Sequence, residues 1–372
     1  MLDLHTLQII WWGIIALLLI GFALTDGFDI GAAILLPFLG RTDQERRIII
    51  NSLGPHWEGN QVWLVTAGAA LFAAWPPVYA TAFSGLYWAM LLVLFALFLR
   101  PVGFDYRSKL DNPRWRQSWD WALFSGSLLP ALLFGVAFAN LFYGIPFRLD
   151  EFLRPSFAGS FWQLLHPFAL IVGLLSLSML VLHGAAWLVL RTTGELAQRA
   201  LSYRRWAAVA TLACYLLAGG WLLSQINGMS LIGEATAGNP TLKQVNLLNP
   251  GWQANYHAHP LSYGLILLAG LGMLLASGKG RWLGFLGSSL SIIGIMLSAG
   301  WALFPFVLPS NLVISHSLTL FDASSSSKTL GFMLIAAAIF VPLILAYSLW
   351  CYKRMWGKLD QAHIEAHSHS LY

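Results

Sequence analysis

Residues 18–38 read LLIGFALTDGFDIGAAILLPF, an apolar stretch that carries two acids, Asp26 and Asp29. The apolar run around it is long enough to cross a bilayer, which takes about 20 residues. Charged side chains are costly inside a membrane, so they usually pair with one another or line a wet path. The stretch therefore predicts a transmembrane helix whose two acids form ion pairs or line a water-filled path.

The whole chain has the composition of a membrane protein. Of its 372 residues, 58% are hydrophobic and only 10% are charged, whereas soluble domains carry about 25% charged residues. No segment is strongly basic, so the net charge of +5 does not indicate a nucleic-acid partner. The two cysteines, Cys214 and Cys351, lie in or at the end of apolar segments and indicate neither a disulfide framework nor a zinc site.

Nine apolar segments are long enough to cross a bilayer. They are residues 8–38, 56–75, 78–99, 121–143, 162–190, 205–224, 260–277, 282–305 and 329–351. The predicted fold is an all-α polytopic membrane protein with nine transmembrane helices. The first and fifth segments are long enough to tilt or to continue past the bilayer.

Two stretches of the sequence resemble each other faintly. Each ends an apolar segment at a basic loop, with Asp26 and Gly27 in one and His183 and Gly184 in the other. This similarity is compatible with two four-helix bundles followed by a ninth helix. We expect the first bundle in residues 1–145, the second in 146–305 with an irregular exterior loop at 225–259, and the ninth helix with a cytoplasmic tail in 306–372.

The basic residues indicate which end of each predicted helix faces the cytoplasm. All lysines and arginines except four lie in the loops reached after an odd number of spans, and the exceptions are Arg148, Arg154, Lys243 and Lys328. Cytoplasmic loops of membrane proteins carry the excess of basic residues. We therefore expect the N-terminus outside the cytoplasm and the C-terminus inside it.

Polar side chains gather at the cytoplasmic ends of the first four predicted spans. Asp26 and Asp29 lie about 25 Å and about 30 Å along the first span, and their spacing puts both on one helix face. The other three spans add polar residues at the same depth: His56, Glu58, Arg100, Asp105 and Asp120. We expect these residues to surround one polar cytoplasmic mouth.

Two interpretations of this polar mouth remain open. In the first, its charges only hold the helices together, with Arg100 paired to Asp29 or Asp120. In the second, the mouth takes up protons, and Glu58 is the best candidate because it stands at a helix start beside His56. Burial and the helix dipole would act on its proton affinity in opposite directions. His56 and Asp26 are the further candidates for the proton path, and whether Asp26 conducts protons or only forms a pair is open.

The rest of the predicted membrane interior offers little for redox chemistry or transport. His183 is the only histidine well inside a span, so a haem with two histidine ligands lacks a second ligand at matching depth. There is no C-x-x-C-H motif, and no midplane cluster of charged residues of the kind that marks transporter sites. We predict no catalytic, cofactor-binding or metal-binding residue on this chain, and a partner that carries the chemistry.

Several motifs, in order along the whole chain, resemble one known family. The chain is similar to subunit II of the cytochrome bd ubiquinol oxidases, and its length resembles the proteobacterial branch. The motifs include TDGFDIG, PHWEGNQVWL, AALFAAWPPVYA, RPVGFDYRSK, RWRQSWDW, FPFVLPS and the terminal HSLY.

The resemblance implies two four-helix bundles and a peripheral helix, packed on a similar subunit I. In this family, subunit I carries two haems b and one haem d with the quinol site, and a small single-helix subunit often joins the complex. A quinone is also expected in subunit II as a structural lipid. The implied activity, in the bacterial inner membrane, is quinol oxidation with reduction of oxygen to water. Protons come from the cytoplasm, so the complex builds a proton motive force without pumping.

The resemblance also implies roles for individual residues. The family's cytoplasmic proton path starts at an acid in the position of Glu58, where many members have Asp. Trp57 and Asn60 fall in the same motif and are expected to pack or hydrogen-bond along the path. The remaining matched positions are expected to form supporting ion pairs: Asp29, Arg100 and Asp120. We expect a supporting role for Asp105 of the mouth as well.

Two alternatives to an oxidase subunit with a proton path are kept. A stand-alone secondary transporter or proton channel would run without a haem-bearing partner. A purely structural subunit would differ from the proton-conducting one at Glu58.

Overall fold

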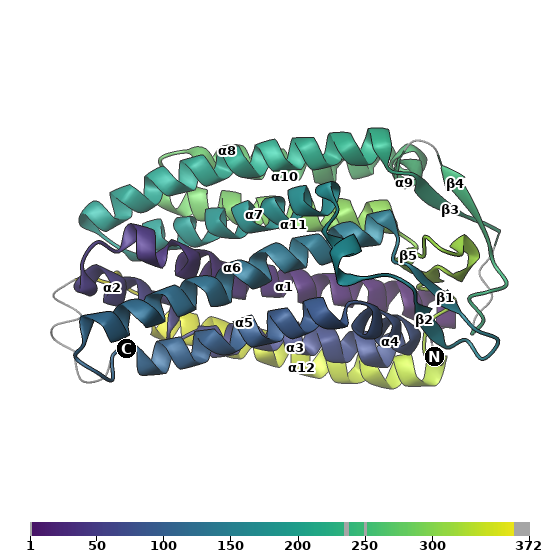
Figure 1. Cartoon of the computed structure of the whole chain (residues 1–372), viewed down its shortest axis with the longest axis horizontal. Coiled ribbons are helices and arrows are strands. Elements are labelled where there is room, and N and C mark those ends of the chain that lie inside the picture. Colours follow the sequence, from purple (N-terminus) through teal and green to yellow (C-terminus); the bar gives the residue numbers. More distant parts are fainter. Residues whose placement is uncertain (1, 234–237, 249–250, 361–372) are drawn as a thin grey trace.

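The structure is a computed structural model that describes residues 2–233, 238–248 and 251–360. Long helices run side by side along the longest axis of the molecule (Figure 1). Three small antiparallel ribbons gather at one end, which we call the ribbon end, and helix α2 (Asp43–Leu53) marks the opposite end, which we call the polar end.

Eight of the described helices are long and apolar enough to cross a membrane, and a bent pair supplies a ninth crossing. The prediction of an all-α polytopic membrane protein is confirmed, with eight candidate spans among the described residues and nine when the bent pair is counted as one. The eight are α1 (Leu4–Leu39), α5 (Tyr87–Tyr106), α6 (Pro113–Tyr143), α7 (Pro167–Arg191), α8 (Gly194–Gln225), α10 (Tyr263–Ser277, extended by the turn at Pro260–Ser262), α11 (Arg281–Leu303) and α12 (Ser327–Arg354).

The bent pair corrects the predicted third span, residues 78–99. Helix α3 (Trp57–Ala74) is followed at once by α4 (Pro76–Gly85), and the two meet at an angle of 120°. The proline ring at position 76 disfavours a helical conformation of Trp75 and removes a backbone donor, so the helix breaks there. The third span consequently starts only at Tyr87, the first residue of α5.

The helices form two neighbouring groups. Helices α1, α3, α5 and α6 pack on one another, and α7, α8, α10 and α11 do the same, while α1 and α6 both contact α7. Helix α12 lies outside against α1 and α3, and almost none of its apolar surface is buried within the chain. This matches the expected pair of four-helix bundles with a peripheral helix, while the exact division at residues 145 and 305 stays a prediction.

The two groups touch through glycines. A Cβ on Gly31 of α1 would lie 1.9 Å from the carbonyl oxygen of Leu180 in α7, and one on Gly184 would lie 2.3 Å from the backbone nitrogen of Ala32. Small residues allow such direct contact between membrane helices. The two faintly similar stretches of the sequence therefore pack against each other.

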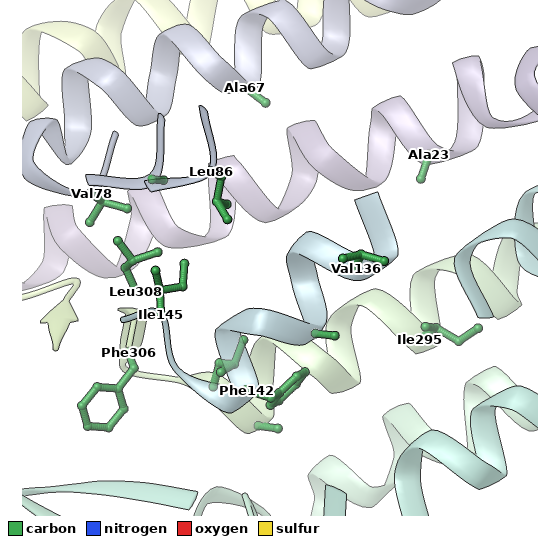
Figure 2. Packing of buried hydrophobic residues seen from close by; sticks show 14 of the residues in the cluster. Ala23, Ala67, Val78, Leu86, Val136, Phe142, Ile145, Ile295, Phe306 and Leu308 are labelled. Carbon is green, nitrogen blue, oxygen red and sulfur yellow. The ribbon is translucent and has the colours of Figure 1, made fainter. Parts of the chain in front are cut away.

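The apolar core continues from the helices into the ribbon end. Side chains of α1, α3, α6 and α11 meet residues of α4 and of strand β5 (Phe306–Leu308) in one cluster (Figure 2). Strand β5 pairs with β6 (Leu318–Thr319), and β1 (Phe147–Leu149) pairs with β2 (Pro155–Phe157).

The exterior loop at 225–259 is not irregular throughout, so that prediction is wrong in part. It contains strands β3 (Gly228–Ile232) and β4 (Gln244–Leu248), which pair antiparallel, and the short helix α9 (Ala254–Ala258). Lys243 is buried and forms an ion pair of 3.0 Å with Asp322, which ties the loop to the segment before α12. Burial lowers the pKa of Lys243 below its ordinary value, although Asp322 opposes this.

Candidate functional site

The polar residues predicted for the cytoplasmic mouth lie at the polar end of the first helix group. Asp26 and Asp29 come from the second half of α1, Asn60 from the first turn of α3, Arg100 from α5 and Asp120 from α6. All five side chains are buried, with at most 3% of their surface exposed. They form three separate clusters.

The first cluster is an ion pair between Arg100 and Asp26. Arg100 donates from Nη1 and Nη2 to the two carboxylate oxygens of Asp26 at 2.8 and 2.7 Å. The predicted partners, Asp29 and Asp120, are therefore wrong, because each of these acids is bound by other residues. Gly126 of α6 lets α5 approach closely, since a Cβ there would lie 2.7 Å from the carbonyl oxygen of Ala96.

The second cluster is a hydrogen-bonded chain that begins at Asp29. Asn60 donates from Nδ2 to Asp29 Oδ2 at 2.7 Å, and the hydroxyl of Tyr352 in α12 donates to Asn60 Oδ1. The other oxygen, Asp29 Oδ1, is buried without a hydrogen-bond partner among the described residues. Among the described residues the Asp29 carboxylate is therefore held by a single side chain, that of Asn60.

Tyr352 was missed at the sequence level. It lies 292 positions from Asn60, and only its place at the polar end of the last apolar segment connects it with the mouth. The ring of His56 stacks on the ring of Tyr352 with a centroid separation of 4.5 Å. His56 is buried and its Nε2 has no partner among the described residues, so it adjoins the chain without a hydrogen bond to it.

The third cluster surrounds Asp120. Arg107 donates from Nε to Asp120 Oδ1 at 2.6 Å, and Arg46 donates from Nη1 to Oδ2 at 2.7 Å. Arg107 also bonds Asp43 at the start of α2. Burial disfavours the charge of Arg107, but Asp120 and Asp43 outweigh it and raise the pKa of Arg107 above its ordinary value. The ion-pair role predicted for Asp120 is thus seen with partners that the sequence did not indicate.

Glu58 stands apart from these clusters. It lies in the first turn of α3 and is exposed, on the same uncovered stripe of the helix as Val62, Val65 and Phe72. Its neighbour Trp57 packs on Phe104, with ring centroids 5.8 Å apart. Glu58 therefore occupies the edge of the mouth, on a helix face that the rest of the chain leaves open.

Asp105 does not join an ion pair within the described part of the chain. It is exposed and borders an open hollow of about 550 Å³ that Tyr106, Lys109, Leu110 and Trp115 also line. No ion pair within the described residues supports the role predicted for Asp105.

Glu45 of α2 fastens the polar end to the second helix group. Its carboxylate accepts a bond from Arg199 of α8, whose Nη1 also donates to the carbonyl oxygen of Leu39 at 2.8 Å. Burial disfavours the Glu45 carboxylate, but the backbone N–H of Arg41 and the Arg199 side chain outweigh it and lower the pKa of Glu45 below its ordinary value.

His183, the histidine inside a span, has both ring nitrogens engaged. Nε2 donates to the carbonyl oxygen of Leu24 at 2.9 Å, because a carbonyl can only accept, and Nδ1 lies 2.8 Å from the hydroxyl of Ser288. A haem or metal ligand needs a free ring nitrogen. The His183 side chain does not fit either role.

Comparison with known proteins agrees with these features. Residues 7–355 match the family described as "Cytochrome bd terminal oxidase subunit II". The chain is 49% identical to the Escherichia coli K12 "Cytochrome bd-I ubiquinol oxidase subunit 2" and 47% identical to the Haemophilus influenzae "Probable cytochrome oxidase subunit 2", in both cases over the full length of both chains. It is 31% identical to the Bacillus subtilis "Cytochrome bd ubiquinol oxidase subunit 2" over 95% of this chain and 96% of that one.

The fold is also similar to that of a solved structure. A chain of the bd oxidase from Geobacillus thermodenitrificans superposes with a TM-score of 0.70 at 17% identity, and the match covers 95% of this chain and 100% of that chain. The full-length relatives and the family match together show that this chain belongs to the cytochrome bd terminal oxidase subunit II family.

Proposed function

We propose that this chain is subunit II of a ubiquinol oxidase complex and provides the place where protons enter from the cytoplasm. The names of the E. coli and B. subtilis relatives support ubiquinol as the reductant. The observation that carries the proton role is a buried carboxylate, Asp29, with one oxygen unbound among the described residues, held by Asn60 two positions after the exposed acid Glu58.

The proposal assigns the redox chemistry to a partner, subunit I. There, two haems b and one haem d supply electron transfer from quinol to oxygen. His183 of this chain has no free ring nitrogen for a haem, which supports this assignment. A small single-helix subunit and a structural quinone in this chain complete the proposed complex, on the strength of the family resemblance.

The proposed orientation puts the polar end in the cytoplasm of a bacterium and the complex in the inner membrane. Most of the lysines and arginines lie at the polar end, as the positive-inside rule requires of the cytoplasmic side. The N-terminus then lies on the periplasmic side with the ribbons, and the end of α12 lies in the cytoplasm.

Within the mouth, the proposal gives the two acids of α1 different tasks. The sequence predicts Asp26, together with Glu58 and His56, as a candidate for the proton path. Both oxygens of Asp26 accept hydrogen bonds from Arg100, so its proposed task is to hold Arg100. Asp29 takes its place as the inner proton site. Asn60 orients its carboxylate, and the ring of His56 backs Tyr352.

The test is Glu58→Gln in the assembled complex. Loss of the outer acid should slow oxygen reduction by on the order of 10²-fold, as removal of a proton-transfer group does. Glu58→Asp should keep most of the activity, because the carboxylate is retained. Glu151→Gln, which removes an exposed acid at the ribbon end, is the matched control and should leave turnover unchanged.

Haem content and complex yield are measured in parallel. They should stay at wild-type levels in Glu58→Gln, because this exposed side chain forms no ion pair within the described chain. Full turnover of Glu58→Gln would remove the proton-uptake claim and leave a structural subunit. A chain that purifies without a haem-bearing partner, even when that partner is co-expressed, would overturn the oxidase assignment.

A further inference from the structure

Three exposed cations stand together at the polar end of the second helix group. Arg205 belongs to α8, Lys279 belongs to the turn between α10 and α11, and Arg281 is the first residue of α11. Trp206 and Trp282 follow two of them directly and are 73% and 56% exposed. We call these five residues the basic rim.

A buried arginine holds the two parts of the basic rim side by side. Arg204 has no exposed surface and donates to the carbonyl oxygen of Gly280 at 3.1 Å and to that of Gly278. Gly284 makes room for it, since a Cβ there would lie 1.9 Å from Arg204 Nη1. The turn that carries Lys279 is therefore fixed against the part of α8 that carries Arg205.

The basic rim lies where lipid headgroups begin. From Arg205 to the end of α8 at Gln225 the helix rises about 30 Å, which is the thickness of the hydrocarbon core. The bonds of Arg204 place the α10–α11 turn at the same depth. Exposed tryptophans are typical of this interfacial layer.

The cations of the basic rim have no acidic partner. None of the three forms an ion pair within residues 2–233, 238–248 and 251–360. The nearest acid along α8, Glu195, lies ten residues earlier, about 15 Å along the helix. At the polar end of the first helix group, by contrast, Arg46 and Arg107 share carboxylates.

Apolar helix surface adjoins the basic rim on the membrane side. Val209 and Leu216 on α8, and Leu271 and Leu274 on α10, each expose more than half of their surface. Acyl chains can cover such surface while a phosphate occupies the rim. We propose that the basic rim binds the headgroup of an anionic phospholipid, with the phosphate between Arg205, Lys279 and Arg281 and the lipid chains along α8 and α10.

The test uses the purified oxidase complex carrying Arg205→Gln, Lys279→Gln and Arg281→Gln together. The delipidated complex is titrated in detergent with phosphatidylglycerol or with zwitterionic phosphatidylcholine, and bound lipid is counted by native mass spectrometry. Each cation near the membrane surface contributes about fivefold to affinity, so the triple variant should bind phosphatidylglycerol more weakly by on the order of a hundredfold. Binding of phosphatidylcholine should be the same in both proteins.

A charge-matched control separates the basic rim from net charge. Lys109→Gln, Arg114→Gln and Lys328→Gln together also remove three exposed cations, but from other parts of the surface, and this variant should bind phosphatidylglycerol like the wild type. Equal phosphatidylglycerol binding by the wild type and the rim variant would overturn the proposal. So would an equal loss in the control, or a wild type that does not prefer phosphatidylglycerol to phosphatidylcholine.

Discussion

The two halves of the molecule fix their polar ends in different ways. In the first half, buried arginines pair with buried carboxylates, as in Arg100 with Asp26 and Arg107 with Asp120. In the second half, Arg191 and Arg204 are equally buried, but they donate to backbone carbonyl oxygens. Both arrangements give buried cations polar partners, yet only the first does so with carboxylates.

The difference bears on the proton role that we propose for the first half. Arg191 donates to the carbonyl oxygen of Met355 at 2.9 Å and lies over the rings of Trp187 and Trp356, at 5.3 and 5.2 Å from their centroids. Carbonyls and aromatic rings do not titrate, so the groups that hold Arg191 offer no proton site. The first half keeps Asp29 beside its ion pairs, and only there does the described structure provide a buried acid with an unbound oxygen.

The largest effect is expected from Arg100→Ala. It leaves the Asp26 carboxylate buried without its partner, which typically costs about 3–5 kcal/mol, so the yield and thermal stability of the complex should fall sharply. Asp26→Asn in the same chain should restore part of the loss, because the uncompensated charge is removed. Arg148→Ala, an exposed position at the ribbon end, is the control. Wild-type yield of Arg100→Ala would show that carboxylate pairing does not hold the first half together.

A smaller effect is expected from Gly284→Ala in the second half. The new Cβ would overlap the guanidinium of Arg204 and displace it from the turn before α11, at a cost of about 1–3 kcal/mol in the free energy of unfolding. Gly270→Ala in α10 is the matched control, since a Cβ there meets nothing within 4 Å and alanine favours a helix. If thermal unfolding of the complex is the same for both variants, the carbonyl-bound arginine does not support this half.

The smallest effect concerns pH. The folded protein lowers the pKa of Glu45 from the ordinary value of 4.5, so the folded state binds a proton less readily than the unfolded chain. The stability contributed by Glu45 is present above about pH 4.5 and is lost as the pH falls through the lower folded-state value. Melting temperatures between about pH 6 and about pH 3 should therefore fall less in Glu45→Gln than in the wild type. Parallel curves for the two proteins would refute this.

The number of helices could be predicted from the sequence because a bilayer demands long apolar runs. The break at Trp75 was missed because apolar composition continues across Pro76 and Pro77, and composition does not register a turn of the chain. The end of the molecule where charges gather was predictable from basic residues alone.

The pairing of the charges was not predictable in the same way. The sequence places five acids at a depth similar to that of Arg100. Which of them pairs with Arg100 depends on how the helices pack, as at Gly126, and the structure shows Asp26. Tyr352 enters the mouth because α12 returns to α3, which no local pattern indicates. Whether Glu58 and His56 carry protons stays a prediction.

The glycine contact between α1 and α7 restricts which substitutions these two helices can accept during evolution. Gly31 and Gly184 meet backbone on the other helix, so neither position has space for even a methyl group. Evolution commonly repairs an enlarged residue by shrinking its neighbour, but no residue is smaller than glycine. A side chain gained on one helix therefore has no compensating substitution opposite it. At this crossing, α1 and α7 must therefore keep glycine at both positions, whereas their loops, charges and lipid-facing surfaces can vary.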